Sequence, residues 1–204
     1  MKGRYHTTAL TKAVFIDRDG VLIEEAGNVH RMDQLRFIPG AIEALEALAG
    51  SGRFRIIIMT EQPGIAHGYF SELDYHLFTD QMLYVLSKRG VRVDAVYYCP
   101  HHPSAAVARY RIECDCRKPG TGMIVKAASE YALELRDSWL IGDKTSDIRA
   151  GSDAGVKTIM VRTGYGGADS SCAAMPDYIA DDLMAAVKLI ERTCPRDFLW
   201  PEFG

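Results

Sequence analysis

Short apolar runs alternate along this chain with longer segments in which apolar residues recur at helical spacing. A continuous apolar run predicts a strand buried on both faces, and spacings of three and four predict an amphipathic helix. The predicted strands are 13–16, 55–59, 93–98, 139–141 and 157–161. The predicted helices are 41–49, 69–89, 122–133, 146–154 and 180–191. This alternation predicts an α/β fold in which a parallel sheet is covered by helices on both faces.

The length of the chain agrees with a single α/β domain. A chain of 204 residues is long enough for one α/β domain with a full core and short for two. Hydrophobic residues make up 48% and charged residues 25%, which is ordinary for a globular protein. We therefore expect residues 1–204 to form a single domain with a Rossmann-like sheet.

Charge and cysteine content limit the classes of partner. The formal net charge of -3 disfavours non-specific nucleic-acid binding, so an anionic substrate would have to be held by local charge or by a metal. The first twelve residues contain no apolar stretch of signal-peptide length, and no later run could span a bilayer. We expect a cytoplasmic protein with no membrane partner. Its five cysteines should be reduced there, which favours metal binding over disulfides.

Acidic side chains follow two of the predicted strands. Asp17 and Asp19 come after the first strand, and Asp143 follows the fourth. Ligands of open parallel sheets bind at the carboxyl ends of the strands, so these carboxylates should converge on one crevice. They would repel one another unless a cation lay between them, and oxygen ligands suit magnesium. Such an ion could neutralise a phosphate and leave one aspartate as the nucleophile.

Two further signals follow the other strands. Thr60 ends the second strand and precedes Gln62 and Pro63, where a hydroxyl and backbone amides can hold a phosphoryl oxygen. Lys118 follows the third strand, and a fixed lysine there can balance charge during phosphoryl transfer. Taken singly, Thr60 is equally well explained as a turn residue, and Lys118 better as a surface lysine.

The ordered set resembles the four motifs of the haloacid dehalogenase superfamily. The set comprises Asp17-x-Asp19-Gly20, Thr60, Lys118 and Gly142-Asp143, and the resemblance covers residues 13–164. It implies that Asp17 forms an aspartyl-phosphate, and that Asp19 protonates the leaving group and then activates water. Thr60 and Lys118 would bind the phosphoryl group. Magnesium would be held by Asp17, the backbone carbonyl of Asp19, and Asp143.

Asp147 is open to two interpretations. It can orient Lys144 or the waters of the ion, or it can be an acidic residue in the first turn of a helix, favoured by the helix dipole.

A cluster of sulfur and imidazole ligands lies in residues 99–116. Three thiols and one imidazole make a full tetrahedral zinc set without an open position, so the site would be structural. His102 could compete with His101 as the ligand. The alternative is that the cysteines bind no metal and that the histidine lies near them by coincidence. The remaining two cysteines, Cys172 and Cys194, are expected to be free thiols. The expected ligands, in the pattern C-x-H-x12-C-x-C, are Cys99, His101, Cys114 and Cys116.

The cysteine loop narrows the resemblance within the superfamily. Cys-Pro-His-His-Pro and Cys-Asp-Cys-Arg-Lys-Pro are similar to the D-glycero-D-manno-heptose 1,7-bisphosphate 7-phosphatases, with the zinc-containing histidinol-phosphate phosphatases as a sister group. This resemblance implies no large cap domain, with loops enclosing a small phosphorylated substrate. Glu25 would accept sugar hydroxyls, and Arg117 and Lys144 would join Lys118 as cationic partners of two phosphates. Gln62 and Pro63 would also contact the substrate.

Two positions depart from the heptose group. Glu61 stands where that group shows asparagine, and Asn28 where it shows tyrosine. Glu61 could point outward, pair with Arg18 or Lys144, or recognise a cationic substrate such as histidinol phosphate. Two alternatives to the heptose phosphatase therefore stay open: a histidinol-phosphate phosphatase and a zinc-stabilised binding protein without catalysis. We also expect a monomer or weak oligomer, with the aromatic segment 197–201 packed on the domain.

Overall fold

The computed structural model describes residues 11–194, so the segment 197–201 lies outside the described residues. Its centre is a six-stranded sheet in which every neighbouring pair is parallel, as the continuous apolar runs predict. The strand order is β3-β2-β1-β4-β5-β6. The strands are β1 (Ala13–Asp17), β2 (Arg55–Glu61), β3 (Ala95–Cys99), β4 (Trp139–Gly142), β5 (Lys157–Val161) and β6 (Tyr178–Ala180).

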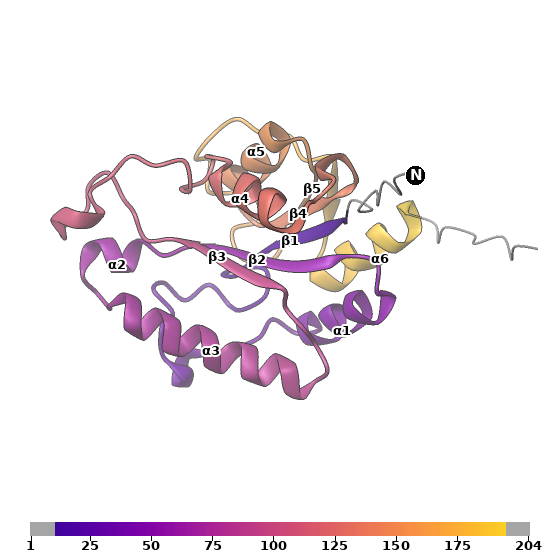
Figure 1. Ribbon diagram of the computed structural model, residues 1–204, viewed down its shortest axis with the longest axis horizontal. Coiled ribbons are helices and arrows are strands. Elements are labelled where there is room, and N and C mark those ends of the chain that lie inside the picture. The colour runs from indigo at the N-terminus through magenta and orange to yellow at the C-terminus, as the bar shows by residue number, and fades with distance from the viewer. Residues whose placement is uncertain (1–10, 195–204) are drawn as a thin grey trace, which may run out of the picture.

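Helices cover both faces of this sheet, so the predicted fold class is confirmed (Figure 1). Helices α1, α3 and α6 lie on one face, and α4 and α5 lie on the other. The helices are α1 (Ala41–Ser51), α2 (Pro63–His67), α3 (Glu72–Lys88), α4 (Gly122–Tyr131), α5 (Thr145–Ala154) and α6 (Leu183–Thr193). Three single turns of 3-10 helix occupy Met32–Gln34, Ala108–Tyr110 and Leu135–Asp137.

The two faces of the sheet belong to separate apolar cores. Val14, Ile16 and Ile58 point to the larger core, which α1, α3 and α6 complete. Phe15 and Ile57, at the alternate positions, point to the core under α4 and α5. Because successive side chains of a strand point to opposite faces, a strand covered on both sides must be apolar throughout. The uninterrupted runs in the sequence follow from this arrangement.

The long helix predicted from residue 69 begins later. Ser71 is the N-cap of α3: its hydroxyl accepts the backbone N–H of Asp74, and the Asp74 carboxylate accepts the N–H of Ser71. This reciprocal capping fixes the start of the helix. The residues before it form the separate short helix α2, whose first position is Pro63 and which ends at the left-handed Gly68.

The last helix also begins later than predicted. Residues 178–180 form β6, an edge strand beside β5, and Asp182 caps α6 by accepting the N–H of Ala185. Only Ala180 of this strand is buried, so the strand lacks an apolar run. Periodicity alone therefore assigned position 180 to the helix.

The strand register brings the predicted site residues to one edge of the sheet. Asp17 lies opposite Met59, so Thr60 is one position further along β2. Ile16 lies opposite Ile141, so Asp143 follows just beyond the end of β4. Helix α2 and the cysteine loop lie at this same end of the sheet, on the left of Figure 1.

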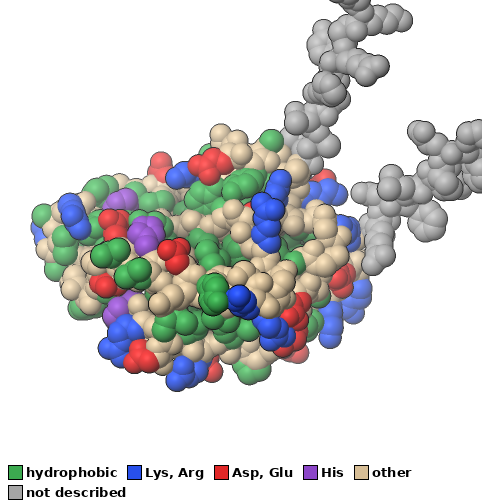
Figure 2. Space-filling model, turned by 60° about the horizontal axis from the view of Figure 1, so that its bottom comes forward, with side chains coloured by type: hydrophobic (Ala, Val, Ile, Leu, Met, Phe, Trp, Pro, Cys, Tyr) green, Lys and Arg blue, Asp and Glu red, His purple; other side chains and the backbone are tan. Residues whose placement is uncertain are grey.

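The surface carries charges of both signs. In the view of Figure 2, Lys and Arg side chains are interspersed with Asp and Glu, and histidines gather toward the end at which α2 lies in Figure 1. Within residues 11–194, none of the helices has the length and apolar character needed to cross a membrane.

Candidate active site

A pocket of about 440 Å³ lies at the carboxyl edge of the sheet. Its walls come from the ends of β1 and β2, from the loops that follow them, and from the segments after Cys116 and Gly142. The predicted residues that line it are Asp17, Asp19, Glu25, Thr60, Gln62, Pro63, Arg117, Lys118 and Lys144. All of the predicted catalytic and substrate-binding residues thus converge on one cavity.

Lys118 lies at the base of this pocket between two carboxylates. Its Nζ donates to Oδ1 of Asp17 at 2.8 Å and also contacts Oδ1 of Asp147. Burial alone would lower the pKa of Lys118, but Asp147 and Asp17 outweigh this effect and raise the pKa well above its ordinary value. The ammonium group is therefore permanently charged and fixed beside the end of β1.

Asp143 is a fully buried carboxylate with one unused oxygen. Its Oδ2 accepts the backbone N–H of Tyr165 at 2.8 Å, whereas Oδ1 is buried without a hydrogen-bond partner among the described residues. Burial and the nearby charge of Asp17 raise the pKa of Asp143 to about 8. No ion pair within residues 11–194 compensates this buried carboxylate, and the charge of Lys144 offsets the rise in its pKa only in part.

The surroundings of Asp143 fit a small divalent cation. Carboxylate oxygens of Asp17, Asp143 and Asp147 lie within 4.8 Å of one another. Gly20, at φ +87°, passes so close that an added Cβ would lie 2.2 Å from Oδ2 of Asp143. Buried carboxylate oxygens at this spacing are the donor set that magnesium prefers, and the cation would supply the missing charge.

Asp147 lies in the first turn of α5, as one of its two interpretations holds, and it has a further partner in Lys118. Besides contacting Lys118, it accepts the backbone N–H of Lys144 at 3.0 Å through Oδ2. It therefore caps the first turn of α5 and fixes the lysine of the pocket at the same time. The sequence analysis did not identify the Lys118 contact, because Lys118 lies on the loop after the cysteine cluster and Asp147 lies in α5, 29 residues further along the chain.

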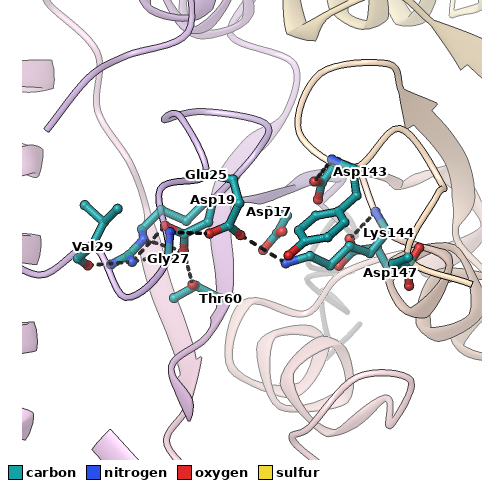
Figure 3. A network of polar contacts seen from close by, with 12 residues as sticks. Asp17, Asp19, Glu25, Gly27, Val29, Thr60, Asp143, Lys144 and Asp147 are labelled. Atoms are coloured by element: carbon teal, nitrogen blue, oxygen red, sulfur yellow. Dashed lines mark hydrogen bonds and ion pairs between the residues drawn. The ribbon is translucent and has the colours of Figure 1, made fainter. Parts of the chain in front are cut away.

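Asp19 lies on the side of Asp17 that is opposite to Lys144 and Asp147, as Figure 3 shows. Its Oδ2 accepts hydrogen bonds from the hydroxyl of Thr60 and from Nε2 of Gln62, both at 3.2 Å. Arg18 donates to both carboxylate oxygens at 3.0 Å. Burial raises the pKa of Asp19 even though Arg18 opposes this effect. The environment therefore favours a carboxyl group that can carry a proton.

Arg18 is a site residue that the sequence analysis did not assign. Its side chain is 1% exposed. It donates to the backbone carbonyl of Val29 at 3.0 Å and lies over the ring of Phe78. An arginine between two aspartates directly after an apolar strand was the available signal. Its contacts fix Asp19 and tie the following loop to the end of β1.

Lys144 lines the wall of the pocket that is opposite to Asp19 (Figure 3). Its Nζ lies 3.4 Å from Oε2 of Glu25 and over the ring of Tyr165, 4.8 Å from the centroid. The other carboxylate oxygen of Glu25 accepts the N–H of Gly27. Tyr165, which the sequence analysis did not identify, thus contacts Lys144 through its ring and Asp143 through its backbone.

Glu61 points toward Arg117, a partner that the sequence analysis did not consider. Oε1 of Glu61 lies 3.2 Å from Nη1 of Arg117, and their side chains are 16% and 30% exposed. The same Nη1 donates to the backbone carbonyl of His101.

The loop after β1, which brings Asn28 to the pocket, packs against α2 and the residues that follow this helix. The ring of His30 stacks on Phe70 with a centroid distance of 4.5 Å and an interplanar angle of 6°. Asn28 adopts a left-handed conformation, and its Oδ1 lies against Gly64. An added Cβ at Gly64 would lie 2.5 Å from that oxygen, so the close approach requires glycine.

The predicted zinc ligands form one cluster. The three Sγ atoms lie 3.1, 3.2 and 3.6 Å apart, which is too long for a disulfide of about 2.05 Å. Nδ1 of His101 lies 3.5 and 4.0 Å from two of them. The four ligand atoms surround one point, as a tetrahedral zinc site requires, but the Sγ separations of 3.1 and 3.2 Å are shorter than the roughly 3.8 Å that Zn–S bonds of about 2.3 Å would give. His102 instead receives hydrogen bonds from Ser104. The cluster comprises Cys99, His101, Cys114 and Cys116.

A family profile and several solved structures match this chain. A family profile described as HAD-hydrolase-like matches residues 115–186. A solved structure, D,D-heptose 1,7-bisphosphate phosphatase from B. bronchiseptica complexed with magnesium and phosphate, has a TM-score of 0.79 and 28% identity, and the match covers 90% of this chain and 100% of that one. A second, from Burkholderia thailandensis, has a TM-score of 0.63 and 27% identity, covering 87% and 97%.

Sequence relatives match over most of their length. The D-glycero-β-D-manno-heptose-1,7-bisphosphate 7-phosphatase of Pasteurella multocida is 44% identical over 76% of this chain and 84% of its own. The protein of the same name from Haemophilus influenzae is 39% identical over 90% of this chain and 98% of its own. This identity shows that the chain belongs to the D-glycero-β-D-manno-heptose-1,7-bisphosphate 7-phosphatase family of haloacid-dehalogenase-like hydrolases.

Proposed function

We propose that this protein removes the 7-phosphate of D-glycero-D-manno-heptose 1,7-bisphosphate, with Asp17 as the nucleophile. The carrying observation is the geometry at the base of the pocket. Nζ of Lys118 lies 2.8 Å from Oδ1 of Asp17. The carboxylate of Asp143, which has a buried oxygen without a hydrogen-bond partner among the described residues, lies in the same cluster of carboxylates as Asp17. The names of the relatives at about 40% identity support the substrate.

Transfer begins with attack on phosphorus. An oxygen of the Asp17 carboxylate forms a bond to phosphorus while the bond from phosphorus to the sugar oxygen breaks. The leaving oxygen takes the proton that Asp19 carries, which the raised pKa of Asp19 favours. Lys118 and the hydroxyl of Thr60 balance the charge that develops on the phosphoryl oxygens.

Hydrolysis of the aspartyl-phosphate completes the cycle. Asp19, now ionised, accepts a proton from a water molecule, and the oxygen of that water attacks phosphorus. The bond between phosphorus and the Asp17 oxygen breaks, releasing phosphate and restoring both carboxyl groups. Arg18 holds Asp19 through two hydrogen bonds, so the same group is in place for both proton transfers.

Magnesium fits the carboxylate group beside Asp17. We propose that Asp17, Asp143 and the backbone carbonyl of Asp19 hold it. When bound, the ion neutralises charge on the phosphate and so allows a carboxylate to approach it. The unpaired oxygen and the raised pKa of Asp143 support this role.

Zinc is proposed for the four-ligand cluster. Three thiols and one imidazole leave no open coordination position, so the ion would fix the loop that carries Arg117 and Lys118. A thiol-rich site of this kind needs reduced cysteines, which supports a cytoplasmic location.

The test is magnesium-dependent phosphate release from the heptose bisphosphate. Asp17→Asn is expected to lower kcat by roughly a thousandfold or more, because the amide cannot attack phosphorus. Asp33→Asn, on the exposed loop 32–34, is the matched control and should keep native kcat. Normal turnover by Asp17→Asn would refute the covalent mechanism. A higher kcat/KM for histidinol phosphate than for the heptose bisphosphate would refute the assignment of the heptose bisphosphate as the substrate.

A further inference from the structure

Each cation that lines the pocket is already paired with a carboxylate. Arg18 pairs with Asp19, and Lys118 pairs with Asp17 and Asp147. The two cations farther from Asp17 are paired as well. These pairs are Lys144 with Glu25, and Arg117 with Glu61.

The pair of Arg117 and Glu61 is held in place from both sides. Glu61 is the last residue of β2 and lies opposite Cys99 in the sheet. Arg117 directly follows Cys116, another residue of the cysteine cluster. The pair is therefore fixed by the sheet and by the cluster.

The carboxylate of Glu61 depends on this pairing. Its Oε1 is buried and accepts no hydrogen bond from the residues in the range 11–194. Nη1 of Arg117, at 3.2 Å, is the charge paired with this buried oxygen, and the charge of Lys118 also acts on Glu61. An anionic group that binds Arg117 must approach this carboxylate and weaken the ion pair.

From this geometry we propose that Glu61 is a specificity-determining residue: by pairing with Arg117, it lowers the preference of the pocket for substrates that carry a second anionic group. The proposal rests on the proposed function, in which one phosphate binds beside Asp17, and it takes Arg117, which lines the same pocket, as the group that meets the other end of the sugar. A substrate with a neutral group at that end leaves the ion pair intact. A bisphosphate has to compete with Glu61 for the guanidinium.

The test compares equilibrium binding of two ligands, the heptose 1,7-bisphosphate and the heptose 7-phosphate. Binding is measured by calorimetry on the full chain with magnesium, in an Asp17→Asn background that prevents turnover. Glu61→Gln keeps the shape of the side chain and removes its charge. We expect the Kd of the bisphosphate, relative to that of the monophosphate, to fall roughly two- to fivefold, the range for a partly exposed ion pair.

Two controls assign the effect to the ion pair. Glu46→Gln removes an exposed carboxylate that pairs with Arg89, away from the pocket, and should leave the Kd ratio unchanged. Adding Arg117→Gln should abolish the effect of Glu61→Gln, since there is no guanidinium left to release. If Glu61→Gln does not fold, Glu61→Asn provides the same comparison.

The outcomes separate this inference from the proposed function. An unchanged or larger Kd ratio in Glu61→Gln would overturn the inference, as would an effect that persists with Arg117→Gln or a failure of the bisphosphate to bind at all. Failure of the proposed function would instead appear as absent phosphate release from the heptose bisphosphate by the native protein. The binding measurement does not depend on that release.

Discussion

Asp147, in the first turn of α5, contacts Nζ of Lys118, and both side chains are almost fully buried. The second oxygen of Asp147 accepts the backbone N–H of Lys144, so one carboxylate joins the start of α5 to the lysine of the pocket. Lys118 therefore owes its position to a residue outside the pocket lining.

Replacing Asp147 should lower catalysis while leaving the nucleophile intact. Asp147→Asn removes the negative charge that holds Lys118, and we expect kcat to fall about 10- to 100-fold. Steady-state phosphate release measures the effect. Asp153→Asn, an exposed position on the same helix that pairs with Arg149, should keep native kcat. Native kcat in Asp147→Asn would show that Lys118 needs no such support.

Removing one ligand of the cysteine cluster should release zinc and destabilise the protein. Metal analysis of the native protein is expected to find about one zinc per chain, as four ligands imply. Cys114→Ser should lose most of it and unfold at a lower temperature. Cys172→Ser, a free thiol outside the cluster, is the control and should keep the metal. Zinc loss without a change in Tm would argue against a structural role.

Asp169 should make stability dependent on pH. It accepts the N–H of Thr145 at 2.7 Å and its hydroxyl at 2.9 Å. Burial opposes ionisation, but hydrogen bonds from Ser171 and Thr145 outweigh it and lower the pKa of Asp169 in the folded state. A lowered folded pKa stabilises the protein above the unfolded pKa of about 3.9, and this stabilisation is lost as the pH falls through the folded pKa.

Asp169→Asn is therefore expected to lower the free energy of unfolding at pH 7 by ~0.5–1 kcal/mol, with solvent screening limiting the effect. The free energies of unfolding from denaturant titrations of the native protein and the variant should begin to converge as the pH falls below about 4 and should meet below the folded pKa. A difference that is constant from pH 3 to pH 7 would rule out a contribution from ionisation.

Gly20 should tolerate no side chain. Its φ of +87° and the 2.2 Å approach of a Cβ to Oδ2 of Asp143 both oppose alanine. We expect Gly20→Ala to destabilise the protein by more than ~1 kcal/mol and to weaken magnesium binding, measured by denaturation and calorimetry. Gly50→Ala on α1, where a Cβ meets nothing within 4 Å, is the control and should be neutral or stabilising. Equal stability of the two variants would contradict the strain argument.

The sequence predicted the site best where the residues end strands. Asp17, Thr60 and Asp143 follow apolar runs, and parallel strands place their carboxyl ends at one edge of the sheet. Their convergence therefore followed from local patterns alone. The sheet and most helices were predictable for the same reason, since burial on both faces leaves a continuous apolar signal.

Contacts between the loop after the cysteine cluster and other elements were not predictable from these patterns. Lys118 and Arg117 reach the pocket from a loop whose path depends on the cysteine cluster, so neither Asp147 nor Glu61 could be matched to its partner from spacing. The edge strand β6 left no apolar run, because only Ala180 is buried. Signals that depend on tertiary neighbours are absent from a single sequence.

The stacking of His30 on Phe70 and the approach of Asn28 to Gly64 join two segments: the loop after β1, which brings Asn28 to the pocket, and the segment that contains α2. Neither of these two segments can change its conformation independently of the other. A transplant of substrate preference into this protein from a relative would therefore succeed only if both segments were exchanged as a matched set.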